Sequence, residues 1–405
     1  MKEYMKKVTC IIGILICSMN MIGCNTGKNE FEDKYIEGQD QQFMFCGNSG
    51  KQMITKSDTG YYFVVGDYLY YVDSEGDEAI VMCNKPNCLH TEETNGYKVP
   101  DCNALFRRID FITYQDGHLY IVYQKIGKQK FELAEISLDG TSRKTVYEFD
   151  RAPTGIAIHR GKLYYSSSVF NNEGKNAYSL QMIDLNKNNL ESKVIYKGEL
   201  PRGSIQHIKC YGKHIYFKEV TIEDEHMRVR AFHYDIKEGK SQRIFSENDK
   251  QIAGHPCTIY NKVYYDIYEY KKEESDNISN FESDLENKNP QPSFKLPLYT
   301  HKMTDGTYIY AIDNTIDSPK KKEDKGVSIY STYGERVAEY SLSCKIGGYE
   351  VWPGDEKYMF LLYENDEYVE WRVVDKSKLL QGENSVKTIL KIDQDKLHPS
   401  MMFKR

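Results

Sequence analysis

A short pattern of turn residues followed by alternating apolar and tyrosine positions recurs along most of the chain. It occupies residues 66–71, 116–121, 160–165, 211–217, 260–265, 305–310 and 355–360. Strict alternation of this kind predicts β-strands that are buried on one face. No stretch shows a sustained helical period of 3.6 residues, so the sequence predicts an all-β protein with little helix.

The copies of this pattern are evenly spaced. Their apolar markers stand at positions 69, 119, 163, 215, 263, 309 and 359. A repeat of about 40–50 residues made only of strands is typical of the blades of a β-propeller, whereas sandwich strands recur at shorter spacing. We therefore expect a single propeller of seven four-stranded blades. Six blades would result if the strand at Ile309 belonged to the outer hairpin of the fifth unit.

The rest of each repeat also reads as strands and turns. Asp139-Gly140, for example, separates two alternating runs and is a strong hairpin signal. Two charged stretches, near residues 271–296 and 317–325, lack a strand pattern and are expected to be insertions. The propeller is then predicted to cover residues 51–395, with a short C-terminal tail at 396–405.

The N-terminus has the pattern of an export signal. Three lysines precede an apolar run from Val8 to Ile22, which is shorter than the ~20 residues of a permanent membrane span. The run ends in Met21-Ile22-Gly23-Cys24, which resembles the lipobox of bacterial lipoproteins, with Met21 where Leu is usual. The resemblance implies that residues 1–23 are removed and that Cys24 is acylated. An ordinary signal peptide or an uncleaved anchor is the alternative.

This reading places the protein on the extracytoplasmic face of the cell membrane, held by its lipid. Residues 24–50 are polar and are expected to form the acylated cysteine and a flexible tether. The chain of 405 residues has a net charge of −6, which argues against a nucleic-acid partner. Its 34 tyrosines against two tryptophans favour strands and suit recognition surfaces. We expect a monomer.

Three cysteines and a histidine lie close together in the first repeat, at Cys83, Cys88, His90 and Cys102. Three thiolates and one imidazole would fill the four positions of a tetrahedral zinc site. Pro86 and the neighbouring asparagines favour a tight turn that would bring Cys83 and Cys88 together. The spacing differs from that of common zinc ribbons.

Disulfides are the main alternative to a metal, because they form outside the cytoplasm. One or two bridges could form among Cys46, Cys83, Cys88 and Cys102, and free thiols are a third reading. Seven cysteines follow Cys24, an odd number, so not all of them can be paired within the chain. Cys210, Cys257 and Cys344 stand alone in strand-like sequence and read as small core residues.

Taken together, the tyrosine-rich repeats, the lipobox and the run Cys83-Asn-Lys-Pro-Asn-Cys88-Leu-His90 with Asp101-Cys102-Asn-Ala resemble uncharacterised β-propeller lipoproteins of Gram-positive anaerobes. The resemblance extends over nearly the whole mature chain. It implies a propeller on the outer face of the membrane and implies no activity.

The sequence contains no nucleophile elbow, no zinc-protease motif and no P-loop. The scattered histidines read as strand residues, with His118 and His214 expected in solvent-facing turns. We therefore expect a binding module for a glycan, peptide or protein partner rather than an enzyme. The alternatives are an extracytoplasmic enzyme on carbohydrate or peptide, with carboxylates at the propeller's centre, and a metal-binding or redox-sensing lipoprotein.

Overall fold

A computed structural model describes the chain in the ranges 32–88, 90, 102–125, 128–170, 176–198, 203–223, 226–244, 251–253, 256–269, 278–296, 300–313, 326–342, 348–383 and 385–394. The predicted signal peptide, Cys24, the insertion at 317–325, Cys344 and the C-terminal tail lie outside these ranges. Within them, neither helical segment has the length and hydrophobicity that crossing a membrane requires.

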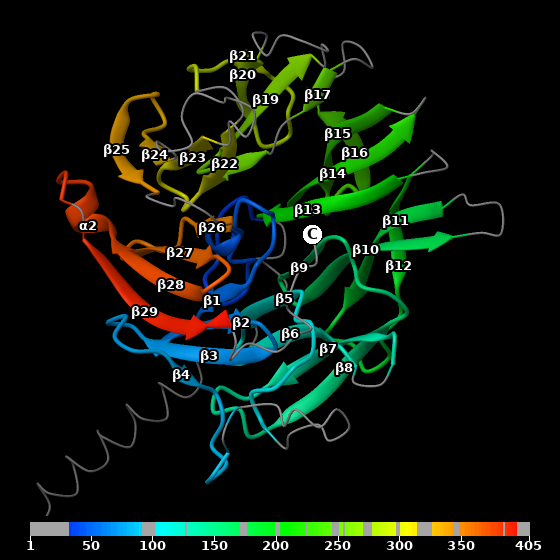
Figure 1. The fold of residues 1–405 in the computed structure, drawn as a ribbon. Helices are drawn as coiled ribbons and strands as arrows, with labels where there is room; N and C mark the ends of the chain where they lie inside the picture. The colour runs from blue at the N-terminus through cyan, green and yellow to red at the C-terminus, as the bar shows by residue number, and fades with distance from the viewer. Residues whose placement is uncertain are drawn as a thin grey trace, which may run out of the picture.

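Seven antiparallel sheets stand in a ring, each a blade of consecutive strands (Figure 1). Blade 1 holds β1 (Ile54–Lys56), β2 (Gly60–Val65), β3 (Tyr68–Asp73) and β4 (Ile80–Val81). Blade 2 holds β5 (Phe111–Gln115), β6 (His118–Gln124), β7 (Phe131–Ile136) and β8 (Arg143–Phe149). Blade 3 holds β9 (Ile156–His159), β10 (Lys162–Phe170), β11 (Asn176–Asp184) and β12 (Lys193–Lys197).

Blade 4 holds β13 (Gly203–Tyr211), β14 (His214–Glu223), β15 (His226–Asp235) and β16 (Lys240–Ile244). Blade 5 holds β17 (Gln251–Ala253), β18 (Cys257–Ile259), β19 (Lys262–Glu269), β20 (Ile278–Asp284) and β21 (Gln291–Pro292). Blade 6 holds β22 (Thr300–Thr304), β23 (Ile309–Asp313), β24 (Gly326–Tyr330) and β25 (Arg336–Ser341). Blade 7 holds β26 (Gly348–Trp352), β27 (Tyr358–Glu364), β28 (Tyr368–Asp375) and β29 (Val386–Asp393).

The seven-bladed prediction is confirmed, and the six-bladed alternative is wrong. Every apolar marker is buried, with Leu69, the most accessible, only 1% exposed. Five markers lie in the second strand of a blade. Val263 lies in β19, which pairs with both β17 and β18 and so takes the place of a second strand in blade 5. Leu69 lies in β3, the third strand of blade 1. Blade 1 differs because its first two strands are joined by the turn 57–59, which lacks the repeated pattern.

The stretch 271–296 is only partly the strandless insertion that the sequence suggested. Its described residues include β20 and β21, which complete blade 5 by pairing onto β19. The sequence of β20, Ile-Ser-Asn-Phe-Glu-Ser-Asp, has its two apolar residues three positions apart and so lacks the period-2 signal of a half-buried strand. Phe281 stacks on Tyr265 of β19, with ring centroids 5.8 Å apart.

Apolar side chains fill the spaces between neighbouring blades. Separate clusters lie between blades 2 and 3, 3 and 4, 4 and 5, 5 and 6, and 6 and 7. The largest cluster joins blades 7, 1 and 2 and closes the ring. There Trp352 stacks on Trp371, with ring centroids 4.7 Å apart, and Phe63 of blade 1 lies 4.7 Å from Trp371.

In the described part of the chain, each blade consists of strands from one continuous segment, and no strand from one chain end joins the blade of the other. The N-terminal segment connects the blades instead. Residues 32–51, here called the plug, lie at the centre of the ring in Figure 1, coloured blue. The expectation of a flexible tether is wrong for these residues, because Asp40, Gln41, Phe45 and Cys46 are each at most 3% exposed.

Backbone and side-chain hydrogen bonds attach the plug to blades 1 to 4. Thr55 Oγ1 and the Lys56 N–H donate to Gln42 Oε1, at 2.7 and 2.9 Å. The Asp116 N–H of blade 2 donates to Gly38 O. In blade 4, the Cys210 N–H donates to Gln41 Oε1 at 2.7 Å, and Gln41 Nε2 donates to Ile208 O at 3.3 Å.

The contacts with blade 3 include a buried ion pair. Arg160 forms two hydrogen bonds with the Asp40 carboxylate, at 2.7 and 3.2 Å. His159 accepts from the Gln41 N–H through Nδ1 and contacts Gly212 O through Nε2. Burial lowers the pKa of His159. This histidine is thus a fully bonded structural residue, as the sequence suggested.

The remaining contacts reach blades 5, 6 and 7. The 3₁₀ turn η1 (Phe43–Phe45) places Phe43 in one apolar cluster with Tyr211 and with Leu285 of blade 5, and η1 also contacts β22 of blade 6. The Gly354 N–H of blade 7 donates to Met44 O, and Asn48 bonds both backbone groups of Val351. One chain segment therefore touches all seven blades.

Two faces of the ring follow from strand direction. The turn face carries the turns between the first and second strands, and the connection face is where each blade's last strand ends and the next blade begins. The plug starts on the turn face, where Asp33 lies 3.1 Å from His214 Nε2. It then runs through the centre to Gly50, whose positive φ (79°) and closeness to the His207 ring leave no room for a Cβ.

His214 was expected to face solvent, and this prediction is wrong. Its side chain is fully buried and lies 2.8 Å from His233 Nε2 through Nδ1. Burial lowers the pKa of His214, and burial followed by the charge of His214 lowers that of His233 to about 4. The plug residue Asp33 covers this pair, which sequence alone could not reveal. His118 is half-exposed, as expected.

The plug contacts predict that Gln41→Ala destabilises the whole ring. The substitution leaves the buried Cys210 N–H without its acceptor, and an unsatisfied buried donor costs about 1–3 kcal/mol. We expect the urea midpoint and melting temperature to fall accordingly. Lys34→Ala is the matched control, because the Lys34 side chain is 64% exposed. Equal stability of the two variants would contradict this role of the plug.

Candidate metal centre and surface cavities

The structure brings together Cys83, Cys88, His90 and Cys102, the four residues that the sequence suggested as ligands. Their ligand atoms all lie within 4.8 Å of one another. They lie on the connection face, in the segment between β4 and β5 that leads from blade 1 to blade 2. Such a group could hold a metal ion such as zinc.

A tight turn forms one side of the cluster. The Cys88 N–H donates to Lys85 O at 3.3 Å, and Asn87 adopts a positive φ of 64°. Asparagine tolerates this left-handed conformation better than most residues, so Pro86-Asn87 is well suited to the turn. His90 also has a positive φ, of 52°, and its Nδ1 lies 3.7 Å from Cys102 Sγ.

The other side of the cluster is fixed to the core. Around Cys102, the Leu69 N–H donates to Ala104 O at 3.0 Å and the Phe106 N–H donates to Asp67 O at 2.7 Å. Arg143 of blade 2 donates to Asn103 O and Leu105 O and lies 3.8 Å above the Phe106 ring. The cluster therefore rests on β3 and is braced by the neighbouring blade.

The electrostatics of the thiols differ. Burial raises the pKa of Cys102 to about 12. Burial acts in the same direction on Cys83, but hydrogen bonds with the backbone of Lys85 and Asn103 and with the other thiols outweigh it and lower its pKa. A divalent cation would stabilise all three thiolates. With four protein ligands the set has no open position, which is typical of structural rather than catalytic zinc.

Cys46 does not join the cluster. It is buried in the plug, where Gln41 Nε2 approaches its sulfur at 3.6 Å, and burial raises its pKa to about 11. The disulfide alternative is thereby restricted to Cys83, Cys88 and Cys102. All the described cysteines are free thiols in the structure, and Cys210 and Cys257 are buried in the core as expected.

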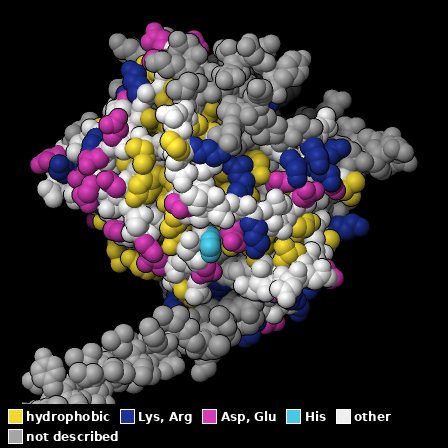
Figure 2. Space-filling model, turned by 90° about the horizontal axis from the view of Figure 1, so that it is seen from below, with side chains coloured by type: hydrophobic (Ala, Val, Ile, Leu, Met, Phe, Trp, Pro, Cys, Tyr) yellow, Lys and Arg dark blue, Asp and Glu magenta, His cyan; other side chains and the backbone are white. Residues whose placement is uncertain are grey.

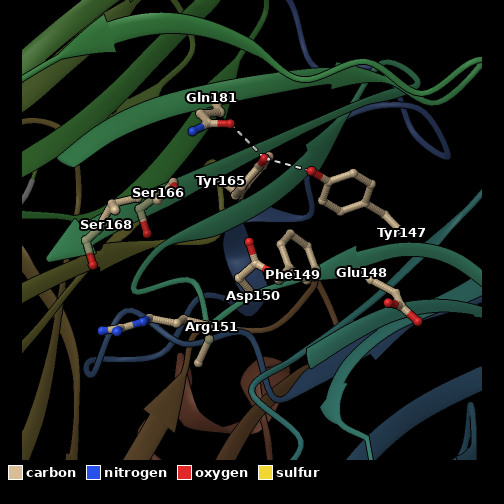
Figure 3. A pocket seen from close by; sticks show the side chains of 12 residues that line it. Tyr147, Glu148, Phe149, Asp150, Arg151, Tyr165, Ser166, Ser168 and Gln181 are labelled. Atoms are coloured by element: carbon tan, nitrogen blue, oxygen red, sulfur yellow. Dashed lines mark hydrogen bonds between the residues drawn. The ribbon is translucent and has the colours of Figure 1, made fainter. Parts of the chain in front are cut away.

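Two cavities open on the connection face. One, of about 320 Å³, lies between blades 2 and 3 (Figure 3). Tyr165 forms part of its wall and is bonded to Gln181 Oε1 at 2.8 Å and to Tyr147 at 3.2 Å. Ser166, at its side, is engaged with the Gly155 N–H. Its polar groups are thus largely satisfied within the protein.

The second cavity, of about 580 Å³, lies where blades 7, 1 and 2 meet. Sequence reasoning identified neither cavity. Their lining residues come from strand ends and connections of different blades, and such positions carry no periodic signal. The adjacent pair Arg107-Arg108 was the one local feature that could have drawn attention to the larger cavity.

No family model matches the sequence, and no curated protein matches it. Solved structures match at the level of the fold. A prolyl endopeptidase structure aligns with a TM-score of 0.54 and 13% identity over 83% of this chain. An oligogalacturonate lyase in complex with manganese aligns with a TM-score of 0.50 and 13% identity, covering 80% of this chain and 86% of the lyase.

This chain spans 48% of the length of the prolyl endopeptidase chain. At 13% identity these likenesses show the propeller fold alone. They carry no information about the activity of this protein.

The cluster geometry predicts that the protein purified without chelator or reductant binds one zinc ion. Cys88→Ser should lose most of that metal, because it removes one of four ligands. Native intact mass measures the metal content, and limited proteolysis should show faster cleavage between residues 83 and 105. The other blades should keep their resistance, since each packs mainly on its neighbours.

Cys257→Ser is the matched control and should keep its full metal content, since Cys257 lies in another blade. A mass that is short only by two hydrogens, with no metal, would show a disulfide in place of the metal centre.

Proposed function

We propose that this protein is a lipid-anchored, extracytoplasmic propeller that binds a glycan, peptide or protein partner through its connection face. The observation that carries this proposal is the plug. It fills the centre of the ring from the turn face, and both cavities described above open on the opposite face. Cavities of about 410 and 400 Å³ also open on the turn face, the first beside the plug at blades 2 and 3 and the second between blades 5 and 6. Because the proposed anchor would hold the turn face toward the membrane, we assign recognition to the connection face.

The position of the plug supports an orientation on the membrane. Glu32 follows the proposed acylation site Cys24 by eight positions, and at ~3.3–3.6 Å per position this stretch spans at most about 29 Å. Glu32 and Asp33 lie on the turn face, where Asp33 contacts Lys213 at 3.6 Å. An anchor at Cys24 would hold the turn face toward the membrane and present the connection face outward.

The plug also weighs against the enzymatic alternative at the propeller's centre. Two carboxylates near the centre are engaged in contacts within the protein: Asp40 with Arg160, and Asp355 with Lys56 and Tyr61. These contacts, especially that of Lys56, outweigh burial and hold the pKa of Asp355 below its usual value. Carboxylates neutralised in this way are poorly suited to acid–base catalysis, so binding is the better-supported function.

Surface composition supports a monomer without a nucleic-acid partner. On the side shown in Figure 2, acidic side chains gather on the left and lysines and arginines on the right, with no basic patch running across it. The exposed large apolar residues are spread over six blades, which argues against a dimer interface. They are Ile80, Val169, Val194, Ile222, Met227, Tyr260, Tyr333, Leu380 and Val386.

The orientation predicts unequal labelling of two introduced cysteines on intact cells. Asp366→Cys is on the exposed β27–β28 turn of the connection face and should react with a membrane-impermeant polyethylene-glycol maleimide. Glu356→Cys is on the turn face and should react slowly on intact cells. After detergent solubilisation it should react several-fold faster than on intact cells. The wild-type chain gives the background of the native thiols. Equal labelling on intact cells would contradict the orientation, and no labelling of either would contradict the extracytoplasmic location.

The binding function predicts saturable retention of at least one member of a panel of immobilised glycans and peptides by purified residues 25–405, without turnover. Attaching the same polymer at Asp366→Cys should weaken this retention, whereas attachment at Glu356→Cys should not. Product formation from any panel member would instead establish the enzymatic alternative.

A further inference from the structure

The larger cavity on the connection face has the size and lining of a small-ligand site. Its volume of about 580 Å³ falls within the ~300–1,000 Å³ range of ligand pockets. Much of its wall is apolar, formed by Met53, Val64, Val65, Ile109, Leu362 and Val369. These side chains come from blades 1 and 7 and the connection to blade 2, so the cavity exists only in the closed ring.

One wall of the cavity is acidic. Glu350 in β26 and Glu364 in β27 lie on paired strands, where Glu350 is opposite Leu362 and Glu364 is opposite Gly348. Glu350 accepts hydrogen bonds from the Ser49 hydroxyl and N–H, which are neutral donors. Among the described residues, no Lys or Arg nitrogen forms an ion pair with either carboxylate. Burial raises the pKa of Glu350 despite the Ser49 bonds.

The lining also carries basic side chains, Lys51, Arg107 and Arg108, which stand beside Asp67 and Asp110. Arg108 has a positive φ of 47°, and its N–H donates to Asp67 Oδ1 at 2.8 Å, which fixes the backbone there. Its guanidinium is 64% exposed and lies 3.9 Å from Asp110, which Lys51 also approaches at 3.5 Å. Exposed ion pairs of this kind contribute little, so a ligand carboxylate can compete for Arg108.

We propose that this cavity binds a short apolar peptide by its free termini, with Glu350 and Glu364 receiving the α-ammonium group and Arg108 the carboxylate. The inference rests on the proposed binding function and names its ligand class. An apolar cavity that carries both acidic and basic groups matches a dipolar molecule with an apolar side chain. Neutral glycans lack both charges, and an internal protein loop lacks the termini.

The ligand class is tested by calorimetric titration of purified residues 25–405 with leucyl-leucine and with its N-acetylated form. The wild-type protein should bind leucyl-leucine about tenfold more tightly, since one charge-assisted contact contributes roughly 1.4 kcal/mol. Glu364→Gln should weaken leucyl-leucine binding to the level of the acetylated peptide and leave the latter unchanged. This substitution keeps the side chain's size at a half-exposed strand end, so the fold is preserved.

Arg108→Gln should act in the same way on the other terminus, removing the preference for leucyl-leucine over its C-terminal amide. Asp366→Asn, on an exposed turn of the same face, is the control and should change neither affinity.

The assignment would be overturned if leucyl-leucine at ~10 mM showed no binding. That result would mean a dissociation constant well above 1 mM, the value that corresponds to a binding free energy of about 4 kcal/mol. Equal affinity for the free and acetylated peptides, or an unaffected Glu364→Gln variant, would overturn it as well. If the panel partner is still retained in those cases, the binding function stands and only the ligand class of this cavity is wrong. If no panel member is retained either, both fail.

Discussion

The structure depends on one constraint: a ring of blades must be closed and its centre filled. Many blade contacts are apolar and join only neighbours, so the first and last blades need a separate connection. Two features provide it here. One is the aromatic packing of Trp352, Trp371 and Phe63, and the other is the plug, whose hydrogen bonds and apolar contacts together reach every blade.

The plug is polar at its centre, and its polar contacts fix the position that it takes in the ring. Gln41 uses both ends of its amide and its backbone N–H to bond blades 3 and 4, and Asp40 is fixed by Arg160. Buried polar groups are costly unless all partners are present. The plug can therefore occupy one register in the ring, which sets where it enters and hence where an N-terminal anchor would emerge.

This asymmetry organises the functional features. The turn face carries the start of the plug and the buried His214–His233 pair, whereas the connection face carries the Cys-His cluster and both cavities. The cluster stands on the segment from blade 1 to blade 2, and the larger cavity lies between the same blades and blade 7. A metal ion in the cluster would stiffen a segment that continues into Arg108, at the rim of that cavity.

The features that depend on residues close together in the chain could be predicted from the sequence. Period-2 alternation and repeat spacing specify strands and blades, because each blade folds from one continuous segment. The cluster was also readable, because its four residues lie within twenty positions of one another. Contacts between residues far apart in the chain could not be predicted in this way. The polar segment of residues 32–50 looks like a tether in the sequence, because the blades that bury it are formed by distant residues. The turn histidine His214 looks exposed, because the sequence does not show that Asp33 lies against it. The plug, the two faces and the cavity of Glu350 and Glu364 became visible in the folded protein alone, because they bring together residues hundreds of positions apart.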